Sequence, residues 1–276
     1  MNTLKIGFIG AGNMARSLIG GLIASGLPAN NIQASAPDRE HLQALANDFS
    51  IRTTTDNQAL LDRCDVIVLA VKPQVLKQIC QALRPAQGSL YLSIVAGIPT
   101  SSIRHWLEQK AETGPLAIIR AMPNTPALLQ TGASALYANP HASEAQRESA
   151  EAIMRAVGLA LWVKDETQMD AVTALSGSGP AYHFLFMEAM ISAARELGLN
   201  EANARLLTIQ TAFGAAKMAL EINENPATLR QNVTSPGGTT ERAIQTFQEG
   251  GFEKLVTAAL SAARDRAREL AEELGQ

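Results

Sequence analysis

A glycine-rich turn close to Met1 constrains the fold of this chain more than any other feature. The apolar run Ile6–Ile9 ends at residues 10–15, which read GAGNMA, and a helical apolar pattern follows at once. In this G-x-G-x-x-A pattern Gly10 permits the tight turn, Gly12 lets a pyrophosphate approach the backbone, and Ala15 lets the helix pack on the strand. The free N–H groups of the first helical turn would face the phosphates. The pattern predicts a dinucleotide site.

Short β-rich runs alternate with helical patterns up to about residue 160. The predicted strands are Ile6–Ile9, Ile32–Ser35, Ile51–Thr53, Val66–Val71, Leu90–Val95, Ala117–Arg120, Ala133–Tyr137 and Leu159–Val163. The predicted helices between them are Met14–Ser25, Arg39–Asp48, Ala59–Arg63, Gln74–Leu83, Ser101–Lys110 and Ser143–Val157. This alternation with short connections indicates an α/β fold with a parallel, doubly wound sheet.

Strand signals stop after Lys164, and the rest of the chain is predicted to be helical. The helices expected there are Pro180–Leu197, Asn203–Glu221, Pro226–Gln231, Thr239–Glu249 and Phe252–Glu272. Their alanine-rich faces permit close helix packing, which favours burial in a partner subunit over an ordinary bundle within one chain. We therefore predict two domains, 1–163 and 164–276, and a homodimer.

Composition excludes several classes of partner. The net charge of −3 at pH 7 gives no basic field, so we expect no nucleic-acid partner. No apolar run is long enough for a membrane span, and no secretory signal peptide is expected. The two cysteines, Cys64 and Cys80, lie far from any second ligand at metal-binding spacing. They predict a reduced, cytoplasmic protein with no metal site.

The end of the second predicted strand bears on the choice of dinucleotide. NAD sites usually have an acidic residue there to bind the ribose 2′-hydroxyl. Residues 33–37 read QASAP instead, and Asp38 and Arg39 follow. The hydroxyl of Ser35 and the guanidinium of Arg39 suit a 2′-phosphate, because arginine forms charge-assisted hydrogen bonds with it. We expect NADPH, with NADH as the alternative if Asp38 faces the ribose.

Three further motifs end strands at the edge of the sheet that carries the glycine-rich turn. Residues 70–73 read AVKP, 93–98 read SIVAGI and 120–126 read RAMPNTP. Ligands of doubly wound sheets bind at the carboxyl ends of the strands. Three such motifs favour a cofactor cleft over a set of ordinary strand-to-helix turns.

Two segments of the helical half stand out. Residues 176–182, SGSGPAY, are interpreted mainly as a site of close helix packing. Residues 234–240, TSPGGTT, combine hydroxyl groups, backbone N–H groups and a helix N-terminus, which suits a small carboxylate. A helix cap at Thr239 or Thr240 is the alternative, and capping and binding can coexist.

The sequence lacks the residue sets that act as bases in alcohol oxidation. It has no Ser-Tyr-x-x-x-Lys set, and no His–Asp pair or helical Lys/Asn pair is evident in the second half. A protonated imine is already polarised and needs less acid–base assistance to accept a hydride. The absence of these residue sets suits an acceptor that is already polarised, of which a protonated imine is one example.

With these motifs in this order, the chain resembles the pyrroline-5-carboxylate reductases over essentially its full length. The most specific part extends from Pro226 to Ile244. The resemblance implies a Rossmann-type domain, then an all-helical dimerisation domain that interlocks in a homodimer, and rings of dimers occur in the family. It also implies reduction of the imino acid 1-pyrroline-5-carboxylate to L-proline by NAD(P)H, the last step of proline biosynthesis.

The resemblance also implies which residues bind each ligand. Those expected at the cofactor are Gly10, Ala11, Gly12, Asn13, Met14, Ser35, Asn57, Ala70, Val71, Lys72, Pro73, Ala96, Gly97 and Ile98, beside Arg39. Those expected at the substrate are Glu166, Asn232, Ser235, Gly237, Gly238, Thr239 and Thr240. Thr240 is the expected catalytic residue, with its hydroxyl near the ring nitrogen. The resemblance alone implies that the two regions come from different subunits.

Two other functions stay open at this point. A β-hydroxyacid dehydrogenase of the 6-phosphogluconate dehydrogenase type shares the opening motif and a helical second domain. That family needs a catalytic lysine on a helix, and Pro180–Leu197 contains none. A redox sensor that binds NADP without turnover is the alternative outside the enzymes.

Overall fold

The computed structural model describes residues 4–85, 88–109 and 114–275. The chain divides into two compact units: one runs to Ser178 and includes the residues from Ala262 onward, and the other is Gly179–Ser261. The change from alternating strands and helices to helices alone comes earlier, since the last strand ends at Trp162. Lys110, the end of one predicted helix, lies outside the described residues.

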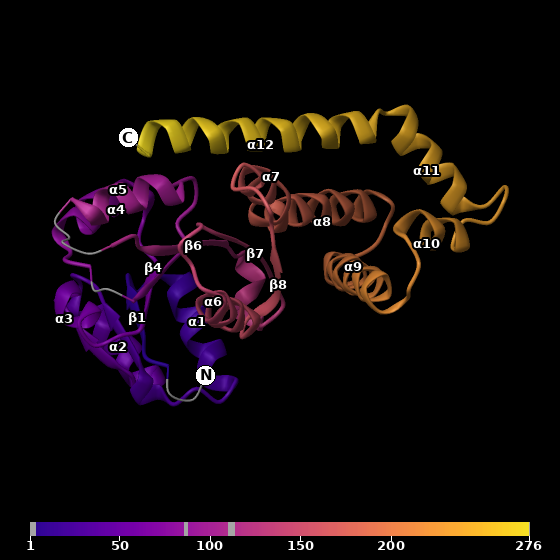
Figure 1. Cartoon of the computed structure of the whole chain (residues 1–276). Coiled ribbons are helices and arrows are strands. Elements are labelled where there is room, and N and C mark those ends of the chain that lie inside the picture. Colours follow the sequence, from indigo (N-terminus) through magenta and orange to yellow (C-terminus); the bar gives the residue numbers. More distant parts are fainter. Residues whose placement is uncertain (1–3, 86–87, 110–113, 276) are drawn as a thin grey trace. The chain divides into compact units, whose positions relative to one another are not determined.

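The first unit is built on a sheet with helices on both faces (Figure 1). Its strands are β1 (Ile6–Ile9), β2 (Ile32–Ser35), β3 (Arg52–Thr54), β4 (Val66–Leu69), β5 (Leu90–Ser93), β6 (Ala117–Met122), β7 (Gly132–Ala138) and β8 (Gly158–Trp162). Its helices are α1 (Asn13–Ala24), α2 (Arg39–Phe49), α3 (Asn57–Leu61), α4 (Pro73–Ala82), α5 (Thr100–Glu108), α6 (Glu144–Arg155) and α7 (Gln168–Val172), with 3-10 turns at Ala29–Asn31 and Thr125–Leu129. The predicted strands and helices of this part are confirmed to within a few residues, whereas α7 and the π-helical turn Thr173–Gly177 were not predicted.

The sheet has the order β3-β2-β1-β4-β5-β6-β7-β8, with β1 as the point where the winding reverses. Strand pairs are parallel except β6 and β7, which are antiparallel. The prediction of a parallel sheet is therefore wrong at this one pair. A parallel crossover needs about a dozen residues or more, usually with a helix, and residues 123–131 form only a short 3-10 turn between the two strands.

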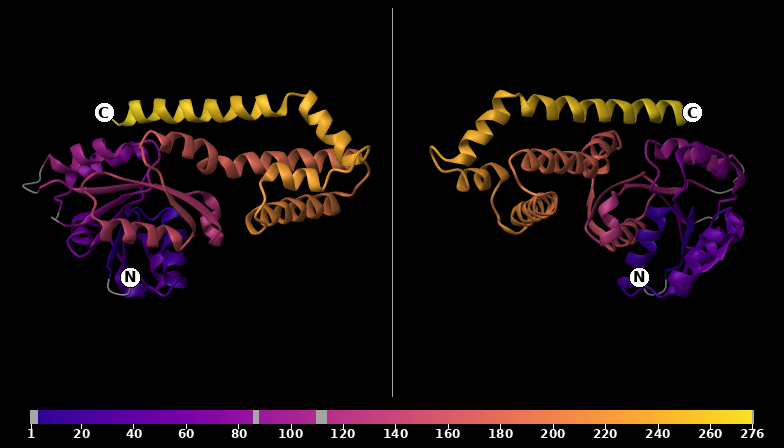
Figure 2. Two further views of the ribbon diagram at one scale, coloured as in Figure 1. Left: turned by 45° about the vertical axis from the view of Figure 1, so that its right-hand side comes forward. Right: turned by 180° about the vertical axis from the view of Figure 1, so that it is seen from behind.

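Two apolar cores lie on opposite faces of the sheet. Figure 2 shows the sheet of the first unit and its helices in two further views. The face of Phe8 and Val68 is covered by α1, α2 and α6. The face of Ile9 and Ile67 is covered by α3, α4 and α5. Because successive strand residues point to opposite faces, a strand covered on both sides is apolar throughout, as Val66–Leu69 is.

The last part of helix α12 (Phe252–Leu274) packs within the first unit. Leu274 contacts the core beneath α4 and α5, and the Ser102 hydroxyl donates to the carbonyl of Gly275 at 2.6 Å. Gly97 lies beside the backbone of Ala271: a Cβ atom added at Gly97 would lie 3.7 Å from the Ala271 nitrogen. The C-terminal helix therefore adds to the cover of the sheet.

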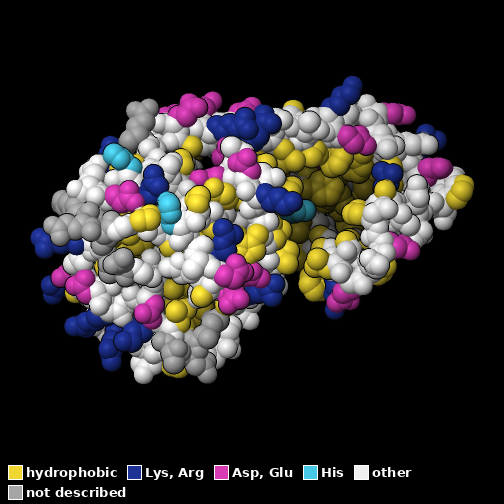
Figure 3. All heavy atoms as spheres, in the orientation of Figure 1, with side chains coloured by type: hydrophobic (Ala, Val, Ile, Leu, Met, Phe, Trp, Pro, Cys, Tyr) yellow, Lys and Arg dark blue, Asp and Glu magenta, His cyan; other side chains and the backbone are white. Residues whose placement is uncertain are grey.

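The second unit is entirely helical. It contains α8 (Gly179–Glu196), α9 (Glu201–Glu221), α10 (Pro226–Asn232), α11 (Thr239–Glu249) and the start of α12. Large apolar side chains on these helices are exposed in the single chain and gather over this unit in Figure 3; Phe184, Leu206 and Phe213 are examples. Over the described residues, no helix is both long and apolar enough to cross a membrane.

Candidate cofactor and substrate sites

Gly10 forms the tight turn between β1 and α1. Its φ of +105° lies in the region that favours glycine. A Cβ atom at this position would lie 2.4 Å from the carbonyl oxygen of Ala70. The Gly10 N–H donates to the carbonyl of Ser35 at 2.8 Å. The turn is therefore fixed against both neighbours of β1, and it sets the position at which α1 begins.

The N-terminus of α1 is open to an anion. Gly12 is the exposed N-cap residue, and a Cβ atom added there would meet no atom within 4 Å. No side chain caps this helix and its first turn contains no acidic residue. Ala11 and Ala15 are buried, which keeps the helix close to the sheet. The N–H groups of the first turn and the positive end of the helix dipole are thus available to a phosphate.

The segment between β2 and α2 places a hydroxyl, a carboxylate and a guanidinium close together in sequence. The buried Ser35 hydroxyl donates to the side-chain oxygen of Asn57 at 2.7 Å, which ties β2 to the start of α3. The Asp38 carboxylate caps α2 by accepting two backbone N–H bonds, at 3.0 and 3.1 Å. Arg39 is exposed, and no hydrogen bond or ion pair joins its guanidinium to another described residue.

Residues Ala70–Pro73 leave the sheet beside the glycine-rich turn. The Ala70 N–H donates to the Ile9 carbonyl at 2.8 Å and extends the pairing of β1 with β4. Lys72 is the exposed N-cap of α4, and Pro73 is its first residue, where a missing N–H group costs nothing. Ala70 and Val71 are partly buried, so Lys72 is the exposed side chain of this segment.

Residues Ala96–Ile98 leave β5 at the same edge of the sheet. Ala96 is exposed, whereas Gly97 and Ile98 are buried. Gly97 has a φ of +78°, so the bend requires glycine. Since the side chain of Ile98 is buried in the core, this residue can offer a cofactor only its backbone.

Glu166 lies in the segment between β8 and α7, and its carboxylate accepts three hydrogen bonds. The donors are Arg120 Nη1 at 2.9 Å, the Thr100 N–H at 2.7 Å and the Thr100 hydroxyl at 2.8 Å. Arg120 is 6% exposed and Thr100 5%. Tyr137 is opposite Arg120 on β7; burial and then the charge of Glu166 raise the pKa of its phenol. Thr100 and Arg120 are not among the predicted site residues, although residues 120–126 form one of the three motifs that favour a cofactor cleft.

The segment 234–240 forms a tight turn that leads into α11. The Gly238 N–H donates to the Ser235 carbonyl at 3.0 Å, with Pro236 and Gly237 at the two central positions. Gly237 has a φ of +71°, as the third residue of a type II turn requires. A Cβ atom at Gly238 would lie 2.9 Å from the Ser235 carbonyl oxygen. The turn therefore favours glycine at position 237 because of its positive φ, and at position 238 because a side chain would be too close to the Ser235 carbonyl.

The donors around this turn differ in availability. Glu241 Oε2 accepts from the Gly237 N–H at 2.7 Å, so both glycine N–H groups are used within the turn. Thr239 and Thr240, the first two residues of α11, are exposed and keep the N–H groups that a helix leaves unpaired. The Asn232 amide donates to Glu224 Oε2 at 3.0 Å. Thr239 and Thr240 thus keep open N–H donors at this turn.

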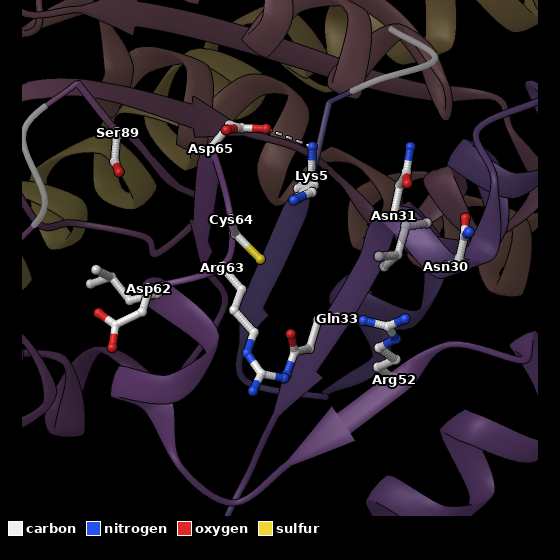
Figure 4. A pocket seen from close by; sticks show the side chains of 12 residues that line it. Lys5, Asn30, Asn31, Gln33, Arg52, Asp62, Arg63, Cys64, Asp65 and Ser89 are labelled. Atoms are coloured by element: carbon white, nitrogen blue, oxygen red, sulfur yellow. Dashed lines mark hydrogen bonds between the residues drawn. The ribbon is translucent and has the colours of Figure 1, made fainter.

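A cavity of about 470 Å³ lies at the opposite edge of the sheet, by the amino ends of the strands (Figure 4). Lys5 precedes β1, Arg52 begins β3, and Asp65 precedes β4, where its carboxylate accepts the Lys5 N–H at 2.9 Å. None of the residues predicted to bind cofactor or substrate lines this cavity. Within the described parts of the chain, no three His, Cys, Asp or Glu side chains are grouped to hold a metal ion.

A doubly wound sheet with an open glycine-rich turn before its first helix indicates a dinucleotide-binding protein. Residues 5–97 match the family model described as "NADP oxidoreductase coenzyme F420-dependent", and residues 166–270 match "Pyrroline-5-carboxylate reductase dimerisation". The pyrroline-5-carboxylate reductase of Pseudomonas aeruginosa is 55% identical over the whole of both chains. The chain therefore belongs to the pyrroline-5-carboxylate reductase family.

Solved structures of the same family agree with the fold. The pyrroline-5-carboxylate reductase of Coxiella burnetii is 44% identical, with a TM-score of 0.90 over 98% of this chain and 99% of that one. The Plasmodium falciparum enzyme, solved with NADP bound, is 26% identical, with a TM-score of 0.84 over 98% and 99%. The dimerisation segment identifies the chain as a homo-oligomer.

Proposed function

We propose that this chain reduces 1-pyrroline-5-carboxylate to L-proline with a hydride from NAD(P)H, the last step of proline biosynthesis. The observation that carries the proposal is a sequence identity of 55%, over the full length of both chains, with a pyrroline-5-carboxylate reductase. Two features of the geometry support it: the open N-terminus of α1, and the turn with free donors before α11. The first suits a pyrophosphate and the second a small carboxylate.

The cofactor is NAD(P)H, and we propose NADPH as the preferred form. Arg39 supports this preference because its guanidinium is exposed and has no partner among the described residues. Asp38, the residue that would favour the ribose hydroxyl of NADH, has its carboxylate committed to the cap of α2. A 2′-phosphate would gain a charge-assisted bond at this position.

The rest of the proposed cofactor site follows the edge of the sheet. Gly12 and the first turn of α1 would hold the pyrophosphate, where no side chain fills the space above Gly12. The segments Ala70–Pro73 and Ala96–Ile98 would lie along the nicotinamide half. Ser35 and Asn57 would shape the adenosine end through the hydrogen bond that joins them, since the Ser35 side chain is buried.

The proposed substrate site is the turn before α11. The N–H groups of Thr239 and Thr240 would receive the carboxylate, while Gly237 and Gly238 keep the turn in shape. Ser235 and Asn232 would lie at its side. When bound, NAD(P)H would supply a hydride to C5 of the protonated imine, with the electron pair of the C=N bond moving to nitrogen to give the neutral amine. The Thr240 hydroxyl would orient that nitrogen and pass a proton to the amine formed.

We propose that the homo-oligomer is built from dimers that join through the helical unit. Exposed apolar side chains on α8 and α9 support this, because a lone chain rarely leaves so many in water. A ring of such dimers is the larger assembly we propose. We also propose a cytoplasmic location, in keeping with the two free cysteines.

A spectrophotometric assay tests the function. Loss of NADPH absorbance is followed with 1-pyrroline-5-carboxylate, and gain of absorbance with 3-hydroxyacids or 6-phosphogluconate and NADP. We expect consumption of NADPH with the imine alone. Oxidation of a hydroxyacid would show a β-hydroxyacid dehydrogenase instead, and tight NADPH binding with no turnover of any of these compounds would show a sensor.

A further inference from the structure

The carboxylate of Glu166 is shared by two segments of the first unit that are far apart in sequence. Oε1 accepts from Arg120 Nη1 and from the Thr100 N–H, and Oε2 accepts from the Thr100 hydroxyl. A carboxylate offers about four acceptor positions, so three are already taken. We propose that Glu166, Arg120 and Thr100 are positioning residues that hold the Ala96–Ile98 segment in place for the nicotinamide, and that Glu166 does not bind the imine directly.

The link from Glu166 to Ala96–Ile98 runs through the start of α5. Thr100 is the first residue of this helix. The preceding Pro99 is the N-cap residue, but its side chain has no hydrogen-bond acceptor with which to cap the helix. Glu166 therefore supplies the cap from another part of the chain, and its negative charge lies at the positive end of the helix dipole. Since only Pro99 separates Thr100 from Ile98, fixing Thr100 also fixes the exit of the segment.

Arg120 gives the carboxylate its second constraint. It lies on β6 in register with Ser93, the last residue of β5, immediately before the segment begins to leave the sheet. Its side chain is 7% exposed and that of Glu166 is 21% exposed. A guanidinium buried to this extent needs a charged partner, because an unpaired buried charge is strongly unfavourable. Glu166 thus joins β6 to the start of α5.

The segment that carries Glu166 is itself fixed. Asp165 accepts from both the N–H and the hydroxyl of Thr167, each at 2.9 Å, and the hydrogen bonds to Thr167 lower the pKa of the Asp165 carboxyl. Gln168 accepts from the Lys164 N–H at 3.1 Å. These local bonds fix the backbone on both sides of Glu166, and the bonds to Arg120 and Thr100 hold its carboxylate, which agrees with a positioning role.

The inference rests on the proposed function, so the wild-type reaction with the imine is measured first and tests that function alone. The dissociation constant of NADPH is then measured by quenching of protein fluorescence without imine. For Glu166→Gln, which keeps the size but loses the charge, we expect it to rise about tenfold, the effect of losing a charge-assisted hydrogen bond. NADPH deuterated at C4 should also give a larger isotope effect on kcat, because a displaced nicotinamide slows the hydride step.

Matched variants separate positioning from general stability. Thr100→Val replaces the hydroxyl by a methyl group and should weaken NADPH binding several-fold. Thr100→Ser keeps the hydroxyl and should bind NADPH with nearly the wild-type dissociation constant. Glu108→Gln is the control for loss of a charge on the same helix, because among the described residues Glu108 makes a single long, half-exposed ion pair, with Arg104 at 3.7 Å. It should bind NADPH as the wild type does.

Two outcomes would overturn the inference while leaving the proposed function intact. One is a Glu166→Gln protein that binds NADPH normally and shows only a higher KM for the imine, since Glu166 would then contact the substrate. The other is equal NADPH binding by Thr100→Val and wild type. If Glu166→Gln does not fold, as judged by circular dichroism, the Thr100→Val and Thr100→Ser pair decides the question.

Discussion

Gly10 and the carbonyl oxygen of Ala70 fit together only while residue 10 has no side chain, because a Cβ atom there would lie 2.4 Å from that oxygen. This relationship joins the glycine-rich turn to the end of β4. It therefore fixes two segments of the proposed cofactor site against each other, and it makes Gly10 a residue of the fold as well as of the site.

We expect Gly10→Ala to destabilise the protein by about 2 kcal/mol or more, since it combines a backbone clash with an unfavourable φ. Urea unfolding measures this change. The control is Gly26→Ala, because Gly26 also has a positive φ of +94° but has open space around a Cβ. Equal losses in the two variants would mean that the contact with Ala70 has no effect of its own.

Gly12 should give the opposite result. Its φ is −72° and an added Cβ meets no protein atom within 4 Å, so Gly12→Ala should lower the melting temperature only slightly, by the cost of alanine at an N-cap. A methyl group there would enter the space proposed for the pyrophosphate, and the dissociation constant of NADPH should rise about tenfold or more. Unchanged binding, measured by fluorescence quenching, would place the pyrophosphate elsewhere.

Arg39 should set the choice between the two nicotinamide cofactors. Without its guanidinium a 2′-phosphate loses a charge-assisted bond, so Arg39→Ala should lower the ratio of kcat/KM for NADPH to that for NADH about tenfold. Arg39→Lys keeps the charge without the planar fork and should fall between the two. An unaltered ratio in Arg39→Ala would show that another group holds the phosphate.

Much of the fold follows from local sequence patterns, and the differences come from long-range contacts. The eight strands were predicted because each is a short β-rich run with a turn signal beside it. The reversed direction of β7 depends on the short connection from β6, and the packing of Leu274 on the sheet depends on contacts with residues far back in the chain. Neither leaves a periodic signal in the sequence.

The glycine-rich turn shows how far local prediction extends at the site. Its geometry depends on adjacent residues, and Gly10 has the positive φ that the motif requires. The partners of Glu166 could not be foreseen in this way, because Thr100 and Arg120 are distant in sequence and meet it only through the order of the strands. The bond from the Gly237 N–H to Glu241 is local, but a side chain at that spacing can also point to solvent.

The two thiols should make stability depend on alkaline pH. Burial raises the pKa of Cys64 to about 11 and that of Cys80 to about 12, from 9.0. The folded state therefore keeps protons that the unfolded chain releases above pH 9, so the stabilisation is complete below pH 9 and is lost as the pH rises toward 11. Each thiol should add a slope of about 1.4 kcal/mol per pH unit in that range.

Urea unfolding between pH 8 and 10.5 measures this dependence. Cys64→Ala and Cys80→Ala should each flatten the curve by about one proton's slope, whatever they do to stability at pH 8. The slope is the readout, because the cavity left by Cys80→Ala lowers stability at every pH. Slopes unchanged by either substitution would contradict the thiol origin of the effect.

Thr240 should affect turnover far more than ligand binding. Its side chain is exposed and, among the described residues, no hydrogen-bond partner holds the hydroxyl, so it is free to meet the ring nitrogen. Thr240→Ala keeps the backbone N–H that would bind the carboxylate, and the KM for the imine should change little. Loss of a group that orients the ring nitrogen and relays a proton should lower kcat about 100-fold.

The control variants keep or remove a hydroxyl nearby. Thr240→Ser should recover most of that rate, and Thr239→Ala, which removes the neighbouring hydroxyl, should retain the wild-type kcat. Steady-state rates of NADPH oxidation for the three variants measure these effects, and a wild-type kcat in Thr240→Ala would remove its hydroxyl from the mechanism.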